Sequence, residues 1–472
     1  MSKSKPTPPW AKEIPEGAFI SYGPTYKVGQ FFHLFNNDFS TDADMKYYFF
    51  DPTEHGFEKG KAYPLLIFLH GYTNALEGDV CINYTGAEFF ATEKYQKALG
   101  GAYILVPLAN EKRNAEEEVI DSWGQTYIEP LYTLICDFIK NHTAANGGVS
   151  KKMLWGNSAG ASMTYTMGEK YPDFFNVLIP VGSDDLPEDS VIDTWDKNDV
   201  HLFLAMGKRD EFNDYQGKIV PRLPRLNKMK HCFIFNPDWV YNGDKGIASI
   251  NFGTEMGQHC LVNPMHSNLL FDDGTTMDER LPRGLTDWLS YALTDHPYID
   301  STPVLETERL ILRPLVFDDL LAIYKWTGDE KTARFMLYPK YKSPADGVDW
   351  VNSLYTNPDD LDYGFVWKET GELIGSGGVY HSHNPESDLW SIGYNIRSDM
   401  WNKGITTEAI SKIIEYARKT RNIPGLAGTF AIDNIGSGRV MEKLGMTYLE
   451  DTEYTKFDGS ATFKAKTYTV RF

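Results

Sequence analysis

Residues 151–160 read KKMLWGNSAG, and this stretch decides the fold class of the first part of the chain. An apolar run leads into Gly156, and residues 161–171 have the composition of a helix. The pattern Gly156-Asn157-Ser158-Ala159-Gly160 therefore lies between a predicted strand and a predicted helix. A serine at such a sharp turn tolerates nothing bulky two residues before or after it. The helix that begins there points backbone N–H groups toward developing negative charge, so Ser158 is a candidate nucleophile.

Further apolar runs surround this turn, at residues 65–72, 102–109, 176–182 and 201–207. Their hydrophobicity is continuous, which is typical of parallel strands buried on both faces. They are separated by intervals of about helix length, and residues 127–143 and 283–293 are predicted helices. Repeated strand–helix–strand units indicate an α/β fold with a doubly wound, mostly parallel sheet.

Two polar residues follow the serine in an order that suits nucleophilic catalysis. Asp210 comes just after the apolar run 201–207, and His259 precedes the last helix of this part. His259 would take the proton of Ser158, and Asp210 would hold the imidazole in the required tautomer. Asp214 and Glu211 are alternatives to Asp210.

His266 is an alternative to His259 in the same loop. The run 65–72 ends in His-Gly-Tyr, upstream of the serine. The backbone N–H groups of Tyr72 and Ala159 are therefore the predicted oxyanion hole.

The segments FLHGYTN (68–74), WGNSAGASM (155–163), AMGKRD (205–210) and GQHCLV (257–262) resemble the α/β-hydrolase superfamily. Within it they are similar to the feruloyl-esterase and peptidase-like branch related to polyhydroxybutyrate depolymerases. The resemblance covers residues 61–293 and implies hydrolysis of a small-molecule carboxylic ester through an acyl-enzyme. Asn157 and Ala159 stand where relatives often carry other small or polar residues.

The second part of the chain begins after residues 296–303, which contain two prolines and no periodicity and are predicted to be a linker. Residues 309–315 form a predicted strand, 364–380 a hairpin that turns at Thr370-Gly371, and 389–396 another strand. A loop with Gly404 then leads into an amphipathic helix that extends to residue 419. A glycine-containing loop at a helix N-terminus suits the pyrophosphate of coenzyme A.

Three ordered segments, ETERLILRPL (306–315), IGYNIRSDMWNKGITTEA (392–409) and NIGSGRVMEKLGM (434–446), resemble GNAT acetyltransferases. The similarity is to the branch of ribosomal-protein N-terminal acetyltransferases and covers residues 304–472. It implies a GNAT α+β domain that transfers acetyl from acetyl-CoA to an amine. It also implies a set of cofactor contacts: a pyrophosphate loop of Trp401, Asn402, Lys403, Gly404, Ile405 and Thr406, a pantetheine contact at Ile392 and Tyr394, and hydrogen bonds from Asn434 and Ser437.

This sequence departs from the acetyltransferase pattern at Thr406, where glycine or alanine is usual, and at Met446, where phenylalanine is more common. Glu408 belongs to the motif and is interpreted as structural. Tyr394 and Tyr454 are candidates for the terminal acid of the transfer. The sequence does not reveal a general base.

Composition limits the remaining possibilities. The chain has 472 residues and a formal net charge of -19, which argues against nucleic acid or an anionic membrane as the main partner. Its four cysteines show no metal-binding or disulfide spacing, and no metal is expected. No signal peptide or membrane span is visible, so the expected location is the cytoplasm.

The expected organisation is a lead-in at 1–17, an α/β-hydrolase domain at 18–295, the linker at 296–303 and a GNAT domain at 304–472. The preferred hypothesis is a bifunctional enzyme. A second hypothesis makes the GNAT-like part a non-catalytic acetyl-CoA sensor that regulates the hydrolase. A third makes the first domain a non-catalytic scaffold.

Overall fold

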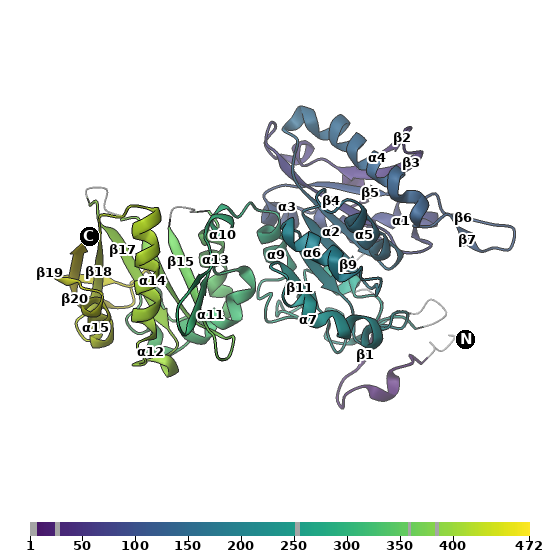
Figure 1. The fold of residues 1–472 in the computed structure, drawn as a ribbon. Coiled ribbons are helices and arrows are strands. Elements are labelled where there is room, and N and C mark those ends of the chain that lie inside the picture. Colours follow the sequence, from purple (N-terminus) through teal and green to yellow (C-terminus); the bar gives the residue numbers. More distant parts are fainter. Residues whose placement is uncertain (1–6, 24–28, 251–254, 357–359, 383–386) are drawn as a thin grey trace. The chain divides into compact units, whose positions relative to one another are not determined.

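The computed structural model describes residues 7–23, 29–250, 255–356, 360–382 and 387–472. The chain divides into two compact units, Met1–Thr294 and Asp295–Phe472. Figure 1 shows each unit as a sheet covered by helices. Among the described residues, no helix combines the length and the apolarity that crossing a bilayer requires.

The first unit is built on an eight-stranded sheet with the strand order β11-β10-β9-β8-β4-β5-β3-β2. Strands β4, β5 and β8 to β11 run parallel, and β3 is antiparallel to both of its neighbours. This agrees with the predicted parallel sheet, whose central strands are apolar throughout because both faces are buried. The strands are β2 (Asn36–Ser40), β3 (Met45–Phe50), β4 (Tyr63–Leu69), β5 (Tyr103–Pro107), β8 (Val149–Asn157), β9 (Val177–Val181), β10 (His201–Ala205) and β11 (Cys232–Phe235).

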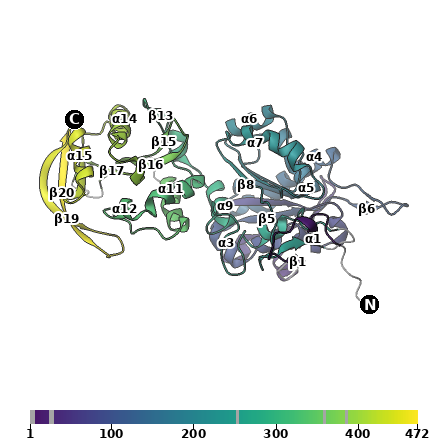
Figure 2. The ribbon, with the colours of Figure 1, turned by 90° about the horizontal axis from the view of Figure 1, so that it is seen from below.

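Helices cover both faces of this sheet (Figure 2). On one face α4 (Ile128–Phe138), α5 (Ala159–Lys170) and α6 (Asp189–Lys197) share a core with the strands. On the other face α9 (Leu285–Ala292) packs its Trp288 ring edge-on against Phe203 of β10. Helix α3 (Glu93–Leu99) lies beside α9. The apolar runs of the sequence thus form the middle layer of three.

The predicted lead-in is part of the first unit rather than a separate tail, as far as it is described; residues 1–6 lie outside the described part. The segment contains a short 3-10 helix, Ala11–Glu13, and the Trp10 ring before it is only 4% exposed. A buried tryptophan removes a large apolar area from water, so Trp10 anchors this segment to the rest of the unit. Further on, β1 (Ile20–Tyr22) pairs in parallel with β12 (Ile247–Ser249).

The predicted linker also contains regular structure. A one-turn helix, α10 (Pro297–Ser301), lies within residues 296–303, and the division into units falls earlier, between Thr294 and Asp295. Proline is favourable in the first turn of a helix, where its missing N–H is not needed. A helix therefore starts at Pro297, where the two prolines and the lack of periodicity predicted an irregular linker.

The second unit has an eight-stranded sheet with the order β13-β14-β15-β16-β17-β18-β20-β19. All neighbours are antiparallel except β17 and β18. The strands are β13 (Leu305–Glu306), β14 (Leu310–Arg313), β15 (Leu361–Trp367), β16 (Leu373–Tyr380), β17 (Trp390–Ile396), β18 (Gly425–Ala431), β19 (Thr447–Thr455) and β20 (Thr462–Arg471).

Helix α14 (Ile405–Thr420) packs its apolar stripe on one face of this sheet, and α15 (Ile435–Lys443) follows β18. The remaining helices are α11 (Leu320–Thr327), α12 (Glu330–Ala333) and α13 (Val348–Leu354). Strands β17 and β18 pair only at Trp390–Leu426 and Ser391–Ala427, and both continue beyond that point. The sheet is therefore split between its two parallel strands.

Candidate active sites

Ser158 lies at the junction of β8 and α5 in a backbone conformation that is unusual for a serine. Its φ is 53° and its ψ is -114°. The two flanking glycines are required by close contacts, because a Cβ on Gly156 would lie 2.0 Å from the carbonyl oxygen of Gly160. A Cβ on Gly160 would lie 2.5 Å from the oxygen of Leu69. The turn holds the serine in a strained position of the kind that clusters at functional sites.

The structure brings Ser158, His259 and Asp210 together. His259 Nε2 lies 3.0 Å from Ser158 Oγ, and His259 Nδ1 lies 3.0 and 2.9 Å from the two carboxylate oxygens of Asp210. With its proton on Nδ1, His259 donates to Asp210 and accepts from the serine hydroxyl. The three side chains form a continuous hydrogen-bonded chain of the kind that activates a serine.

The Asp210 carboxylate is fully buried, and other groups fix its orientation. Its Oδ1 accepts hydrogen bonds from the backbone N–H groups of Phe212 and Asn213, at 2.9 and 3.0 Å. The alternative Asp214 instead caps the following helical turn by accepting from Gly217 N–H. Asp210 is therefore the carboxylate that faces the imidazole.

The alternative histidine, His266, lies in a different environment. Its ring stacks on Phe89 with centroids 5.2 Å apart. Complete burial lowers the pKa of His266 to about 3, so this imidazole stays neutral. Of the two histidines, only His259 forms a hydrogen bond with Ser158.

The loop after β4 provides the predicted oxyanion-hole residue Tyr72. In the described part of the chain, neither the Tyr72 nor the Ala159 backbone N–H donates a hydrogen bond within the protein. The Tyr72 side chain is 52% exposed, and its hydroxyl donates to Val119 O. Both predicted amides are thus free to bind an anion.

Two side chains, the buried His70 and the partly buried Glu111, order this loop, and the sequence alone does not indicate either role. His70 Nδ1 lies 2.8 Å from Gly71 O, and its Nε2 accepts from Ala109 N–H at 3.0 Å. Burial lowers the pKa of His70, which keeps the ring neutral and suits this pair of bonds. The Glu111 carboxylate accepts from the N–H groups of Thr73 and Ala75.

Glu211, weighed above as a rival of Asp210, supports the histidine loop instead. Its Oε2 accepts from His259 N–H at 2.7 Å, and its Oε1 accepts from Gln258 N–H at 3.1 Å and from Trp10 Nε1 at 2.7 Å. Burial raises the pKa of Glu211, and these hydrogen bonds counteract the shift. The carboxylate therefore joins the N-terminal segment to the backbone of His259.

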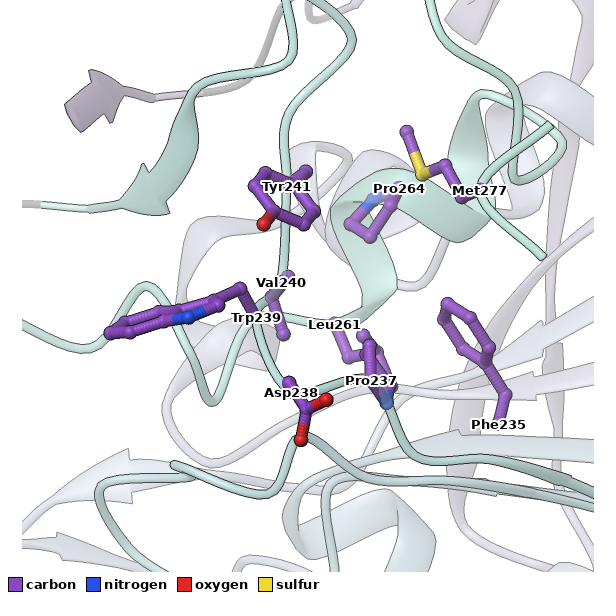
Figure 3. A pocket seen from close by; sticks show the side chains of 9 residues that line it. All are labelled: Phe235, Pro237, Asp238, Trp239, Val240, Tyr241, Leu261, Pro264 and Met277. Carbon is purple, nitrogen blue, oxygen red and sulfur yellow. The ribbon is translucent and has the colours of Figure 1, made fainter. Parts of the chain in front are cut away.

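A cavity of about 310 Å³ lies beside the same loop. Figure 3 shows its lining, which is apolar and aromatic except for Asp238. Lys208 Nζ lies 2.9 Å from the Asp238 carboxylate and balances its charge. The lining includes none of Ser158, His259 and Asp210. It consists of Phe235, Pro237, Asp238, Trp239, Val240, Tyr241, Leu261, Pro264 and Met277.

Asp199, His201 and His231 are the residues of the described chain whose ligand atoms come close enough to suggest a metal. The two imidazole rings stack with centroids 4.0 Å apart and an interplanar angle of 8°. Nitrogen lone pairs lie in the ring plane, so parallel stacked rings do not point at one ion. Lys230 Nζ also lies 2.6 Å from Asp199 Oδ1, and we assign no metal to this cluster.

In the second unit, the loop before α14 contains two residues in the left-handed region, Asn402 with φ 61° and Gly404 with φ 74°. In the first turn of α14, the backbone N–H groups of Ile405 and Thr406 have no acceptor within the helix. Arg309, which the sequence analysis did not single out, donates from its guanidinium to Lys403 O at 3.0 Å. The loop thus combines free amides with positive charge.

Glu408 fastens the start of α14 to the turn between β13 and β14. Its carboxylate accepts from Thr307 Oγ1 and from the backbone and guanidinium of Arg309. Burial opposes ionisation of Glu408, but these hydrogen bonds prevail and lower its pKa. This geometry agrees with the structural role expected for Glu408. The exposed Trp401 is held by a hydrogen bond from its Nε1 to Ile396 O.

The other predicted cofactor residues gather between β17 and α15. The Tyr394 hydroxyl lies 2.9 Å from Ser437 Oγ, and Asn434 caps α15 by accepting from Ser437 N–H. Ile392 is partly buried against the core beside them. Burial raises the pKa of Tyr394 to about 12, so the phenol keeps its proton. The Tyr454 hydroxyl instead donates to Phe335 O at 2.6 Å.

Comparison with known proteins agrees with the interpretation of the second unit. The family model described as an acetyltransferase (GNAT) domain matches residues 309–447. The uncharacterized N-acetyltransferase YoaA of Bacillus subtilis is 28% identical over 30% of this chain and 82% of its own length. YnaD of the same organism is 29% identical over 30% of this chain and 81% of its own.

A solved GNAT-family acetyltransferase from Bacillus anthracis matches 36% of this chain and 98% of its own, at 20% identity and a TM-score of 0.32. The family match and the two curated relatives confirm the GNAT prediction for the C-terminal part of the chain. Residues 309–447 are an acetyltransferase domain of the GNAT type.

Proposed function

We propose that the chain combines two enzymes, a serine carboxylic-ester hydrolase in the first unit and an acetyl-CoA-dependent N-acetyltransferase in the second. The observation that carries the hydrolase half is the hydrogen-bonded chain Ser158–His259–Asp210 at a strained strand-to-helix turn. The parallel sheet and the chain order Ser, Asp, His support assignment of this unit to the α/β-hydrolase fold.

The hydrolysis follows from the positions of these groups. Ser158 Oγ attacks the ester carbonyl while His259 Nε2 takes its proton, and Asp210 stabilises the imidazolium that forms. The carbonyl oxygen becomes negative and accepts hydrogen bonds from the N–H groups of Tyr72 and Ala159. His259 then protonates the departing alcohol. Water releases the acid from the acyl-enzyme in a second cycle of the same steps.

A fluorophosphonate probe tests the hydrolase half directly, because it reacts only with an activated serine. We expect the intact chain to be labelled and Ser158→Ala to lose the label. Ser162→Ala is the matched control, since Ser162 lies one helical turn further on and its hydroxyl donates to Asp185. A panel of p-nitrophenyl esters with different acyl lengths should then be hydrolysed by the control and not by Ser158→Ala.

Lack of labelling in the intact chain would refute the hydrolase proposal and favour the scaffold alternative. Labelling that survives in Ser158→Ala would place the nucleophile elsewhere.

For the acetyltransferase half, we propose acetyl-CoA as the co-substrate. Its pyrophosphate would be held by the loop Trp401–Thr406 and the N-terminus of α14, with Arg309 adding charge. The pantetheine arm would lie along β17 at Ile392 and Tyr394, where the strand separates from β18. The Tyr394 phenol, paired with Ser437, is suited to return a proton to the departing thiolate.

Two measurements test this half. Isothermal titration should detect acetyl-CoA binding, and a CoA-release screen should identify amines that accept the acetyl group. Binding without release across the whole amine panel would overturn the proposed transfer. It would instead support the alternative in which the domain senses acetyl-CoA and regulates the hydrolase.

A further inference from the structure

The split between β17 and β18 exposes one edge of β17 just where a thioester would lie. The two strands pair only as far as Ser391 and Ala427, so no described strand pairs with that edge of β17 from Ile392 onward. The other edge of β17 stays paired with β16 as far as Ile396. Groups that lie over β17 at this level are therefore placed to act on an acceptor.

Three neighbouring strands present almost no side chains on one face at this level. Asp362 of β15 is opposite Gly378 of β16, and Gly378 is opposite Gly393 of β17. Residues that face each other across antiparallel strands share one face of the sheet. Tyr380 is on the same face, and a Cβ added to Gly393 would lie 3.2 Å from its ring. The tyrosine ring therefore lies against Gly393 of β17, and its hydroxyl reaches Asp362.

Asp362 is a buried carboxylate that is only half satisfied. The side chain is 4% exposed, and its Oδ2 accepts from the Tyr380 hydroxyl at 3.1 Å. Within the described residues, its Oδ1 makes no hydrogen bond of good geometry, although the Tyr363 backbone N–H is close enough to lower the pKa of the carboxyl. A buried unpaired oxygen is costly, and native proteins rarely retain one without a functional reason.

Ionisation of this carboxylate takes place close to neutral pH. Burial raises the pKa of Asp362 to about 7, and the charge of Asp360 adds to the shift. The Tyr380 hydroxyl works in the opposite direction. Among the described residues, the ring of His381 faces Asp360, with Nδ1 3.2 Å from the Asp360 carboxylate. A carboxylate with these properties can alternate between accepting and releasing a proton at physiological pH.

We propose that Asp362 is the general base of the acetyl transfer, with Tyr380 holding its second oxygen. This inference rests on the acetyltransferase function of the second unit. Asp362 Oδ1 takes one proton from the ammonium form of the acceptor. The freed nitrogen attacks the thioester carbon, a C–N bond forms, and the C–S bond breaks with its electron pair on sulfur. A second N–H proton reaches the thiolate, and Asp362 then releases its proton to solvent.

The test compares Asp362→Asn and Tyr380→Phe with the unchanged chain, using acetyl-CoA and measuring CoA release. Three acceptors are used: a lysine side-chain amine with a pKa of ~10.4, a peptide α-amine with a pKa of ~8, and hydroxylamine, which is neutral at pH 7. We expect Asp362→Asn to lower kcat/KM by ~100-fold or more for the two ammonium acceptors. Hydroxylamine needs no such deprotonation before attack and should be affected far less.

The pH profile provides a second readout that a merely structural role would not change. The acidic limb of kcat/KM near pH 7 should disappear in Asp362→Asn, while the KM for acetyl-CoA stays within twofold. Asp319→Asn is the matched control, because Asp319 is also buried in this unit but is paired with Arg313. The Asp319→Asn variant should therefore keep the acidic limb of kcat/KM near pH 7.

Two outcomes would overturn the proposal: an Asp362→Asn enzyme that keeps the acidic limb, or one that loses all three acceptors equally. Tyr380→Phe should shift the limb and lower the rate less than Asp362→Asn does. If the unchanged chain releases no CoA with any acceptor, water included, acetyl transfer itself is refuted. That result is distinct from a failure of Asp362.

Discussion

Asp362 should make the second unit less stable as the pH rises, chiefly because its carboxyl group is buried. Its pKa is raised from 3.8 to about 7 in the folded state. The folded protein therefore retains a proton that the unfolded chain has already lost. Stability is highest below pH ~4, falls as the pH rises to about 7, and is constant above that. Three pKa units correspond to roughly 4 kcal/mol, since each unit is worth ~1.4 kcal/mol.

The substitution Asp362→Asn removes the ionisable group and keeps its shape. We expect it to abolish this pH dependence and to stabilise the second unit by roughly 3–5 kcal/mol at pH 8 relative to the unchanged chain, with little difference at pH 4. Hydrogen exchange of the intact chain, followed by mass spectrometry of peptides from β15 and β16, measures the opening free energy of this unit.

The two proteins must diverge between pH 4 and 7. A constant difference in opening free energy over that range would show that Asp362 is not buried as an unpaired acid, and the reasoning would fail. A variant that is more stable and less active is the expected sign of a residue retained for catalysis at the expense of stability.

Three further predictions concern other sites. Glu211→Gln should place an amide NH2 group either against the N–H of His259 or against the N–H groups of Gln258 and Trp10, and should lower kcat for p-nitrophenyl esters by ~10-fold or more. Trp10→Phe removes only one hydrogen bond and should lower kcat less. Gly160→Ala should abolish fluorophosphonate labelling and destabilise the first unit by ~1–3 kcal/mol in urea unfolding, because the new Cβ has no space; undiminished labelling would contradict the geometry. Arg309→Gln should weaken acetyl-CoA binding by ~10-fold in isothermal titration, and an unchanged Kd would remove Arg309 from the cofactor site.

The sheet strands were predictable from the sequence because their signals are local. Continuous apolar runs anticipated β4, β5, β9 and β10, and the GNAT assignment came from three motifs in order. Strand β11 (Cys232–Phe235) was not anticipated, since four residues are too short a run to be distinguished from other buried chain.

The supporting residues could not be predicted because their partners are distant in the sequence. Glu211 is held by a hydrogen bond from Trp10, and Arg309 is held by a hydrogen bond to Glu408, and both partners are far away in the sequence. Asp362 gave no signal in the sequence, since its burial and its orphaned oxygen depend on how β15, β16 and β17 pair. Nothing in the residues around it distinguishes it from an exposed aspartate.

The early strand β1 has a consequence for how the chain matures on the ribosome. Ile20 pairs with Ile247, and Trp10 packs on Trp239, so this segment is synthesised long before the residues on which it docks. Contacts this distant in sequence close slowly. The nascent segment with Trp10 therefore stays accessible to proteases and chaperones until Trp239 has been synthesised, and the Trp10 hydrogen bond to Glu211, which supports the backbone of His259, can form only after Glu211 has been synthesised.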